Sequence, residues 1–282
     1  MEHRSPYCAN CGTPTPDAFC GHCGQRNLQL HLSLRELLGE AIEEAFGIDS
    51  RIVHTARLFL LQPGQLTRDY LGGRRQRYTS PLKLYLVTSA VFFLVLALRS
   101  EPMEVNLTRK SKGTGGEVHV GVTLPGDREQ RPAGWLGAKL SESTDKLLGA
   151  TPEQRTELVA RLHSDLIGWL AKAMFALVPF FAGLLALLFR RAGRFYVEHL
   201  VFAMHLHAFG FLLESIPVAL RIDWLRSVAV LGIVAYLFVA LRAVYGEGRA
   251  RTLFKLLALL ASYGLLLTMT IAGVALISLV SL

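Results

Sequence analysis

The sequence predicts an all-α integral membrane protein with about five transmembrane helices and a small N-terminal zinc ribbon. Composition predicts the membrane part, because 51% of the 282 residues are hydrophobic and only 18% are charged. The apolar residues are also gathered into stretches of about 20, the length that spans a bilayer core of about 30 Å. Four cysteines close to the N-terminus predict the ribbon. Together these features argue against a soluble enzyme.

The ribbon is predicted over residues 1–27, where the cysteines are spaced C-x2-C-x8-C-x2-C, namely Cys8, Cys11, Cys20 and Cys23. Two thiolates separated by two residues can bind one tetrahedral Zn²⁺ from a single tight turn, and two such turns complete the site. Gly12 and Gly24 follow the second cysteine of each pair, where a tight turn often needs a positive φ. Because four thiolates leave no open position, the Zn²⁺ is predicted to be structural, with no catalytic residue.

Two disulfides are the alternative arrangement of these cysteines, and they would need an oxidising compartment. A redox-active C-x-x-C pair is a second alternative, but such pairs normally lie beside a larger βαβ fold, which about 30 residues cannot form. His22 lies between Cys20 and Cys23, yet the cysteines already fill the tetrahedron. The spacing therefore favours zinc over both alternatives.

An amphipathic helical collar is predicted over residues 28–81. Apolar residues recur with helical spacing over 33–46 and again over 49–61, and Pro63 and Gly64 end the second helix. The collar either forms a small soluble subdomain or lies in the membrane interface, and its apolar faces favour the interface. Three arginines precede the first span; their simplest role is to anchor the topology, and they are also predicted to face lipid headgroups: Arg74, Arg75 and Arg77.

The first transmembrane helix is predicted over residues 82–99, and four more are predicted within residues 166–282. The four lie at about 167–189, 200–220, 225–244 and 253–280. Residues 100–165 are predicted to form an extracytoplasmic loop with amphipathic helices. In this loop Thr151 is predicted to cap a helix together with Gln154.

Lysine and arginine residues set the predicted orientation, because the cytoplasmic loops of membrane proteins are enriched in them. Clusters at 74–77, 190–194 and 242–255 all fall on one side of the membrane. The net charge of +8 is consistent with contact with the anionic lipids of a bilayer. The N-terminus and the ribbon are therefore predicted to be cytoplasmic, and the C-terminus extracytoplasmic.

Ionisable residues at membrane depth are costly, so those of the third span are candidate functional residues: Glu198, His199, His205, His207 and Glu214. They could form a proton or ion relay, supply one side of a metal site completed by another helix, or take part in packing. At about 100° per residue, His205 and His207 point about 200° apart, which argues against one metal ion bound by this helix alone. Packing is the favoured role of the three.

The sequence contains no motif of nucleotide binding, serine hydrolases or zinc metalloproteases. It therefore predicts a non-enzymatic membrane protein whose ribbon is a protein-interaction or assembly module. The alternative is an ion, proton or small-solute transporter that uses the polar residues of the third span. A membrane metalloenzyme would need ligands on another helix, and the other spans contain no His, Asp, Glu or Cys. Nucleic-acid binding by the ribbon is not favoured, because residues 1–30 contain only Arg4 and Arg26 as basic side chains.

Several stretches resemble a bacterial domain-of-unknown-function family, family 3667, whose members are multi-pass membrane proteins with an N-terminal zinc ribbon. The matching stretches are the two C-x-x-C-G turns, residues 63–75 and 78–81, and residues 198–202 with His205 and His207. The resemblance implies a location in the bacterial inner membrane, and it implies no activity. Gln62 departs from the family pattern, which tends to carry a basic residue before Pro-Gly.

Overall fold

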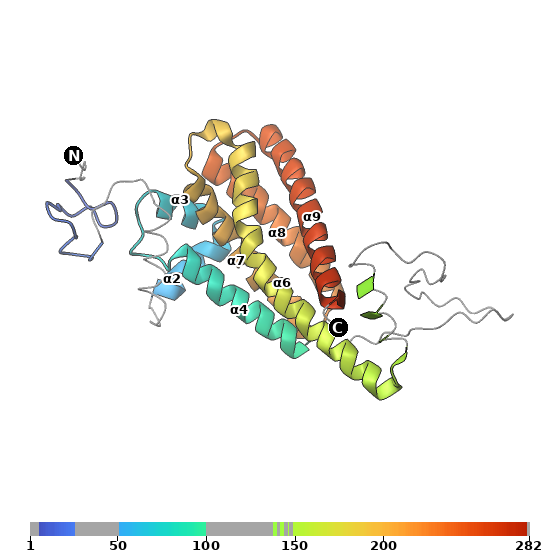
Figure 1. The fold of residues 1–282 in the computed structure, drawn as a ribbon. Coiled ribbons are helices and arrows are strands. Elements are labelled where there is room, and N and C mark those ends of the chain that lie inside the picture. The colour runs from blue at the N-terminus through green and yellow to red at the C-terminus, as the bar shows by residue number, and fades with distance from the viewer. Residues whose placement is uncertain are drawn as a thin grey trace. The chain divides into compact units, whose positions relative to one another are not determined.

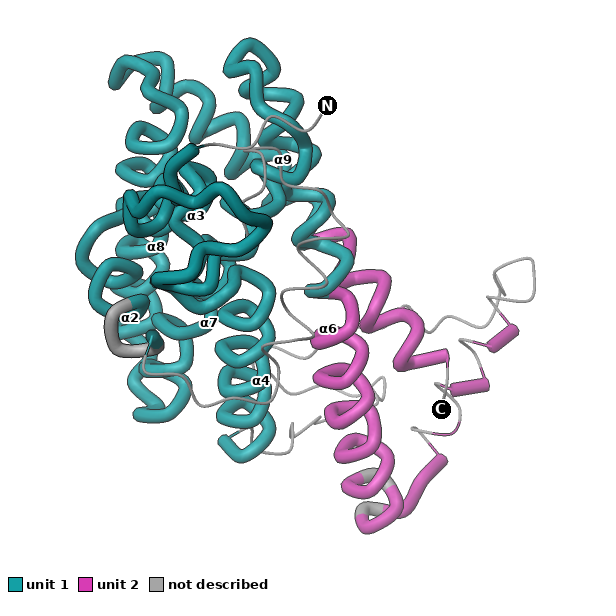
Figure 2. Tube along the Cα trace, turned by 90° about the vertical axis from the view of Figure 1, so that its left-hand side faces the viewer, with its two compact units in different colours: residues 1–99, 174–267 teal, residues 100–173, 268–282 magenta. Residues whose placement is uncertain are grey.

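The computed structural model describes residues 6–25, 51–99, 138, 139, 142, 143, 146 and 149–280. The chain divides into two compact units, one of residues 1–99 and 174–267 and the other of residues 100–173 and 268–282 (Figure 2). Regular structure in the described residues is helical, apart from isolated bridges near the N-terminus such as that between Tyr7 and Pro14. The helices drawn in Figure 1 are α2 (Arg51–Leu61), α3 (Gln65–Leu71), α4 (Pro81–Arg99), α6 (Pro152–Leu188), the short 3-10 helix η1 (Arg190–Ala192), α7 (Tyr196–Leu220), α8 (Asp223–Tyr245) and α9 (Arg249–Val280).

Five of these helices are long and apolar enough to cross a membrane: α4, α6 from Thr156 onward, α7, α8 and α9. The predicted fold class, an all-α membrane protein with about five spans, is therefore confirmed. Several of the helices begin before the predicted spans. Helix α7 starts at Tyr196 because the Glu198 carboxylate accepts the Phe195 N–H at 2.8 Å, which satisfies a donor at the helix N-terminus.

Helix α7 is the central helix of the first unit. Within its span 61% is buried inside the protein, against 28% or less for each of the other four spans. Helices α4 and α8 pack along it. The core among the helices includes Tyr85, Phe181, Leu185, Val201, Phe202, Ala203, Leu241 and Leu259. A helix buried by its neighbours can carry polar side chains without exposing them to lipid, which explains why the polar span is this one.

Helices α2 and α3 form a helical hairpin (residues 51–71, called the hairpin below) that packs on α7 and α8. Pro63 and Gly64 separate the two helices, as predicted, and Gly64 adopts a φ of 80°. The Thr67 hydroxyl on α3 lies 2.9 Å from His205 Nδ1 on α7. The hairpin is therefore in direct contact with the spanning helices.

In the second unit, α6 begins with the predicted cap. The Gln154 N–H donates to Thr151 Oγ1 at 3.3 Å, and the Thr151 N–H donates to Gln154 Oε1 at 3.0 Å, which confirms the capping box. Further along α6, Lys172 Nζ lies 4.5 Å from the centre of the Trp169 ring, a cation–π contact. The predicted helix over residues 33–46 and the first part of the predicted extracytoplasmic loop, residues 100–137, lie outside the described residues.

Candidate metal centre

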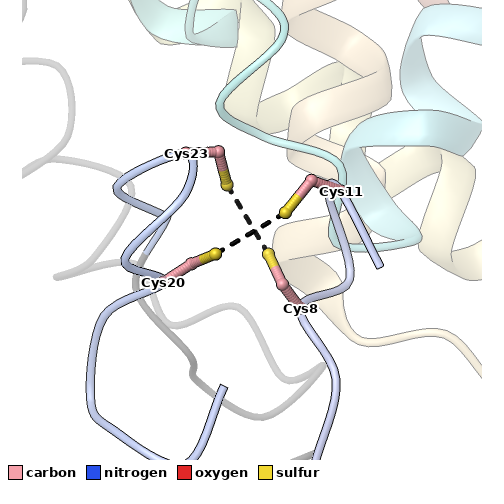
Figure 3. Close-up of side chains that lie close together, drawn as sticks. All are labelled: Cys8, Cys11, Cys20 and Cys23. Atoms are coloured by element: carbon pink, nitrogen blue, oxygen red, sulfur yellow. Dashed lines mark hydrogen bonds between the residues drawn. The ribbon is translucent and has the colours of Figure 1, made fainter. Parts of the chain in front are cut away.

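The four cysteines predicted as metal ligands lie together in the N-terminal head (residues 6–25), with their sulfurs pointing toward one centre (Figure 3). All four Sγ atoms lie within 4.8 Å of one another. Cys8 Sγ is 3.6 Å from Cys23 Sγ, and Cys11 Sγ is 3.5 Å from Cys20 Sγ. A tetrahedral ion with metal–sulfur distances of about 2.3 Å needs sulfurs about 3.8 Å apart, so this set fits a metal ion.

The sulfur–sulfur distances also distinguish a metal site from the disulfide alternative. A disulfide would join two sulfurs at about 2 Å, and all four cysteines are free thiols. His22 is exposed, as a residue without a place among the ligands should be. Within the described parts of the chain, the four cysteines are the only group of three or more histidine, cysteine or carboxylate side chains that could hold a metal ion.

The backbone of the head repeats one turn twice, which explains the C-x-x-C-G pattern. The Gly12 N–H donates to Cys8 O at 2.8 Å, and the Gly24 N–H donates to Cys20 O at 2.8 Å. Both glycines have positive φ, 76° and 71°, as predicted from their place after the second cysteine. A side chain at either position would strain the turn that brings two thiols together.

The thiols differ in acidity before any metal binds. Burial raises the pKa of Cys8 to about 11, whereas the hydrogen bond with the Thr13 hydroxyl lowers the pKa of Cys11 to about 5. The Cys23 N–H lowers the pKa of Cys20 by stabilising its thiolate. Because a metal ion binds thiolates, its binding displaces protons from the less acidic thiols, and its affinity falls with falling pH.

Gln25, a residue that the sequence did not single out, joins the head to the helical bundle. Its backbone carbonyl accepts the Cys20 N–H at 2.8 Å. Its buried side chain binds residues 73–76, called the docking loop below, between α3 and α4. Nε2 donates to the first carbonyl of this loop at 2.7 Å, and Oε1 accepts the N–H groups of Arg75 and Gln76 at 3.2 and 3.4 Å. A distortion of the Cys20 turn would therefore displace Gln25 from the loop.

The docking loop is fixed by Asp69, a buried residue of α3 that the sequence also did not single out. Asp69 accepts the Tyr78 O–H at 2.6 Å and the Gln65 side-chain N–H at 2.7 Å, and it pairs with Arg74. Burial alone would raise the pKa of Asp69, but the hydrogen bonds from Tyr78, Arg74 and Gln65 outweigh it and hold the pKa below its usual value. Burial, together with this carboxylate, raises the pKa of Tyr78 to about 12. The ionised Asp69 thus links α3 to Arg74 within the docking loop and to Tyr78, which follows the loop.

Two of the three arginines predicted to face headgroups are held by the protein. Arg74 pairs with Asp69, and the Arg75 guanidinium lies 5.5 Å from the centre of the Tyr70 ring. Arg77 is exposed, and the Arg74 side chain remains 42% exposed. Arg74 and Arg77 therefore have exposed surface that an anionic headgroup could contact. Arg75 instead packs on the hairpin through the Tyr70 ring.

Two of the five polar residues of the third span lie in the first turn of α7. The Glu198 carboxylate caps the helix and lies 3.5 Å from the Arg194 guanidinium. His199 Nδ1 is 2.7 Å from the Tyr245 hydroxyl, at the end of α8. Arg194 also donates to a carbonyl in the last turn of α8 at 2.8 Å. These contacts join the start of α7 to the end of α8.

The other two histidines point in different directions, as their spacing predicts. His205 Nδ1 contacts Thr67 of the hairpin at 2.9 Å. His207 Nδ1 is 2.8 Å from Ala203 O, and its Nε2 is 2.7 Å from the Tyr263 hydroxyl of α9. Because a carbonyl only accepts, Nδ1 of His207 carries the hydrogen and Nε2 accepts the Tyr263 O–H. A neutral His207 is thus fully hydrogen-bonded, which supports a packing role for it.

Two buried polar atoms of α7, His205 Nε2 and Glu214 Oε1, have no hydrogen-bond partner among the described residues. The five polar residues are distributed along α7 and do not converge. Within the described ranges none of them belongs to a group that could hold a metal ion. The alternative of a metal site completed by another helix therefore has no support from the geometry of the described residues.

Comparisons with known proteins bear on the hairpin and the first span. No curated protein and no solved structure matched this chain. The family model described as "Protein of unknown function (DUF3667)" matches residues 49–93, which comprise the hairpin, the docking loop and most of α4. The resemblance to this family that was found in the sequence is therefore confirmed over residues 49–93.

Proposed function

We propose that this chain is a non-enzymatic multi-pass membrane protein whose head binds a structural Zn²⁺ and serves as a protein-interaction or assembly module. Four thiolates are a complete ligand set for structural zinc and leave no position for water or substrate. The observation that carries the proposal is the contact of Gln25. Because Gln25 is bonded both to the Cys20 turn and to the docking loop, the metal-bound shape of the head is linked to the membrane domain.

The surface of the head supports a protein partner. Tyr7 and Phe19 are 59% and 58% exposed on this small head, and large aromatic side chains are enriched in protein interfaces. Residues 6–25 contain no lysine or arginine. A surface without basic residues is unsuited to a nucleic-acid backbone, so the proposed partner is a protein.

The proposed location is the bacterial inner membrane, with the head cytoplasmic and the C-terminus extracytoplasmic. The arginines of η1, between α6 and α7, and those between α8 and α9 support this orientation through the positive-inside rule. A reducing cytoplasm would keep the four thiols available for zinc.

Three purified full-length proteins test the proposal: wild type, Cys8→Ser/Cys20→Ser and Gln25→Ala. Elemental analysis should find one zinc per wild-type chain, none in the cysteine variant and a full content in Gln25→Ala. Amide hydrogen exchange at Arg75 and Gln76 should accelerate by roughly tenfold in both variants, because their N–H groups lose an acceptor worth about 1.4 kcal/mol.

Partner binding is measured on the same three proteins by crosslinking in the native membrane. Protein partners that crosslink to wild type should be lost from the cysteine variant. If the cysteine variant keeps every partner, the head is not an interaction module. If exchange in the docking loop is unchanged without zinc, the head and the membrane domain are not coupled.

A transporter of ions, protons or small solutes is the second candidate function, and the unpaired buried atoms of α7 favour it. His205 Nε2 and Glu214 Oε1 have no partner in the described part of the chain, whereas Glu198, His199 and His207 are bonded within the protein. Flux into proteoliposomes should fall to background in His205→Ala and Glu214→Gln if these groups carry it. Equal flux in wild type and both variants would exclude this function for them.

A further inference from the structure

We propose that η1 and the first turn of α9 (residues 190–192 and 249–252, called the basic surface below) bind the phosphate of an anionic phospholipid between two spanning helices. This site goes beyond the proposed function of the head, and it contains none of the arginines that the sequence predicts to face headgroups. Helix α9 is the least buried of the five spans, with 11% of its span buried inside the protein. A lipid bound to both η1 and α9 would therefore strengthen the attachment of this helix to the bundle.

The two halves of the basic surface lie side by side. The end of α6 and the start of α9 are at the same end of the bundle (Figure 1). Lys255 Nζ on α9 lies 4.2 Å from the centre of the ring of Phe189, the residue directly before η1. The Phe189 ring also stacks on Tyr245 at the end of α8, with ring centres 4.0 Å apart. Arg251 precedes Lys255 by four residues, so the two side chains share the face of α9 that meets η1.

The basic surface carries positive charge that the protein does not neutralise. The segments that form and flank it, residues 189–199 and 242–255, contain two carboxylates. Glu198 lies 3.5 Å from the Arg194 guanidinium, and Glu247 accepts a hydrogen bond from Lys255 at 2.6 Å. Both carboxylates are thus paired with basic residues outside the basic surface. Four arginines of the surface are exposed and have no hydrogen-bond or ion-pair partner within the described residues: Arg190, Arg191, Arg249 and Arg251.

The position of these arginines identifies the anion as a lipid. Helix α6 ends directly before η1, and α9 begins with the other half of the surface, so the arginines lie where two spans reach the headgroup level. On the membrane side of the arginines, Leu187, Leu253 and Phe254 are 66%, 50% and 74% exposed. A phospholipid carries its phosphate next to acyl chains, which matches this order of charged and apolar surface. Basic surfaces between spanning helices bind anionic headgroups in this way.

Native mass spectrometry of the delipidated full-length protein tests the proposal. The probes are phosphatidylglycerol, which is anionic, and phosphatidylcholine with the same acyl chains, which has no net charge. The test variant, Arg190→Gln/Arg251→Gln, removes one charge from each half of the basic surface. The matched control is Arg221→Gln/Arg226→Gln, which removes two exposed charges at the other end of the bundle, where α7 leads into α8. An elution volume and a circular dichroism spectrum identical to those of wild type establish that each variant is folded.

Wild type should bind phosphatidylglycerol roughly tenfold more tightly than phosphatidylcholine. The test variant should lose roughly thirtyfold in affinity for phosphatidylglycerol, the equivalent of about 1 kcal/mol for each arginine, and the control should keep the wild-type affinity. Equal losses in the test variant and the control would show a general effect of net charge, and wild-type affinity in the test variant would place the lipid elsewhere. Either result would overturn the proposal, as would displacement of phosphatidylglycerol by an equal concentration of inorganic phosphate, which would show that no lipid is needed.

Two further variants keep the test decisive. Arg191→Gln/Arg249→Gln has the same expected loss and replaces the test variant if that protein does not fold. Cys8→Ser/Cys20→Ser should bind phosphatidylglycerol as wild type does, because the cysteines are not part of the basic surface. A failure of the lipid site is therefore distinguishable from a failure of the proposed function of the head.

Discussion

Replacing Asp69 by asparagine should lower the free energy of unfolding by about 3 kcal/mol. Its buried carboxylate accepts hydrogen bonds from Tyr78 and Gln65 and pairs with Arg74. A hydrogen bond to a charged group contributes about 1.5–3 kcal/mol, and a donor left unpaired in a buried site adds to the loss. The Arg74 side chain is 42% exposed, so the ion pair itself adds little. The measurement is unfolding of the purified protein in mixed micelles titrated with denaturing detergent.

The stability difference between wild type and Asp69→Asn should depend on pH, and this dependence identifies the carboxylate as its source. The pKa of Asp69 in the folded state lies below its usual value, so its contribution is fully present above an unfolded pKa of about 4 and is lost as the pH falls through the lower, folded value. Wild type and Asp69→Asn should therefore converge in stability at acid pH. Tyr78→Phe removes one donor and keeps the charge, and it should cost about 1.5 kcal/mol. A gap between wild type and Asp69→Asn that is the same at pH 3 and pH 7 would contradict this account.

The features that the sequence predicted correctly depend on short-range spacing. The C-x-x-C-G pattern predicts both the cluster of thiols and the positive φ of Gly12 and Gly24, because one turn contains all the residues involved. Apolar length predicts the five spans, since bilayer thickness sets it. The Thr151 cap and the divergent directions of the histidines follow in the same way from helical geometry.

The features that the sequence did not predict depend on contacts between distant residues. Gln25 and its docking loop are 48 residues apart, and Thr67 and His205 are 138 apart. The pattern of α2 predicts that the helix is amphipathic, but an apolar face can bury itself in a membrane interface or against another helix equally well. Which surface it meets is decided by the shapes of α7 and α8, and these are not encoded in α2 itself.

Replacing Gly64 by alanine should lower the free energy of unfolding by about 2–5 kcal/mol and release the hairpin from α8. Gly64 has a φ of 80°, a conformation that costs other residues about 1–2 kcal/mol. A Cβ there would lie 2.9 Å from Ala240 O and 3.0 Å from Ala240 Cα. Both atoms belong to the backbone of a spanning helix and cannot rotate away, so overpacking adds about 1–3 kcal/mol. Detergent unfolding gives the loss, and amide exchange in residues 58–66 reports whether the hairpin is released.

Alanine substitutions at two other glycines distinguish the stability loss caused by backbone strain from the loss caused by close packing. Gly193 has a φ of 65°, but a Cβ added there would meet no heavy atom within 4 Å, so Gly193→Ala should cost only the conformational part, about 1–2 kcal/mol. Gly248 has neither a positive φ nor a close neighbour, and Gly248→Ala should be neutral. Ala243→Gly should recover only a small part of the Gly64→Ala loss, because it relieves the 3.1 Å contact with the Ala243 Cβ and leaves the backbone of Ala240 in place. Equal losses in Gly64→Ala and Gly193→Ala would mean that the hairpin does not lie against α8 as closely as the structure places it.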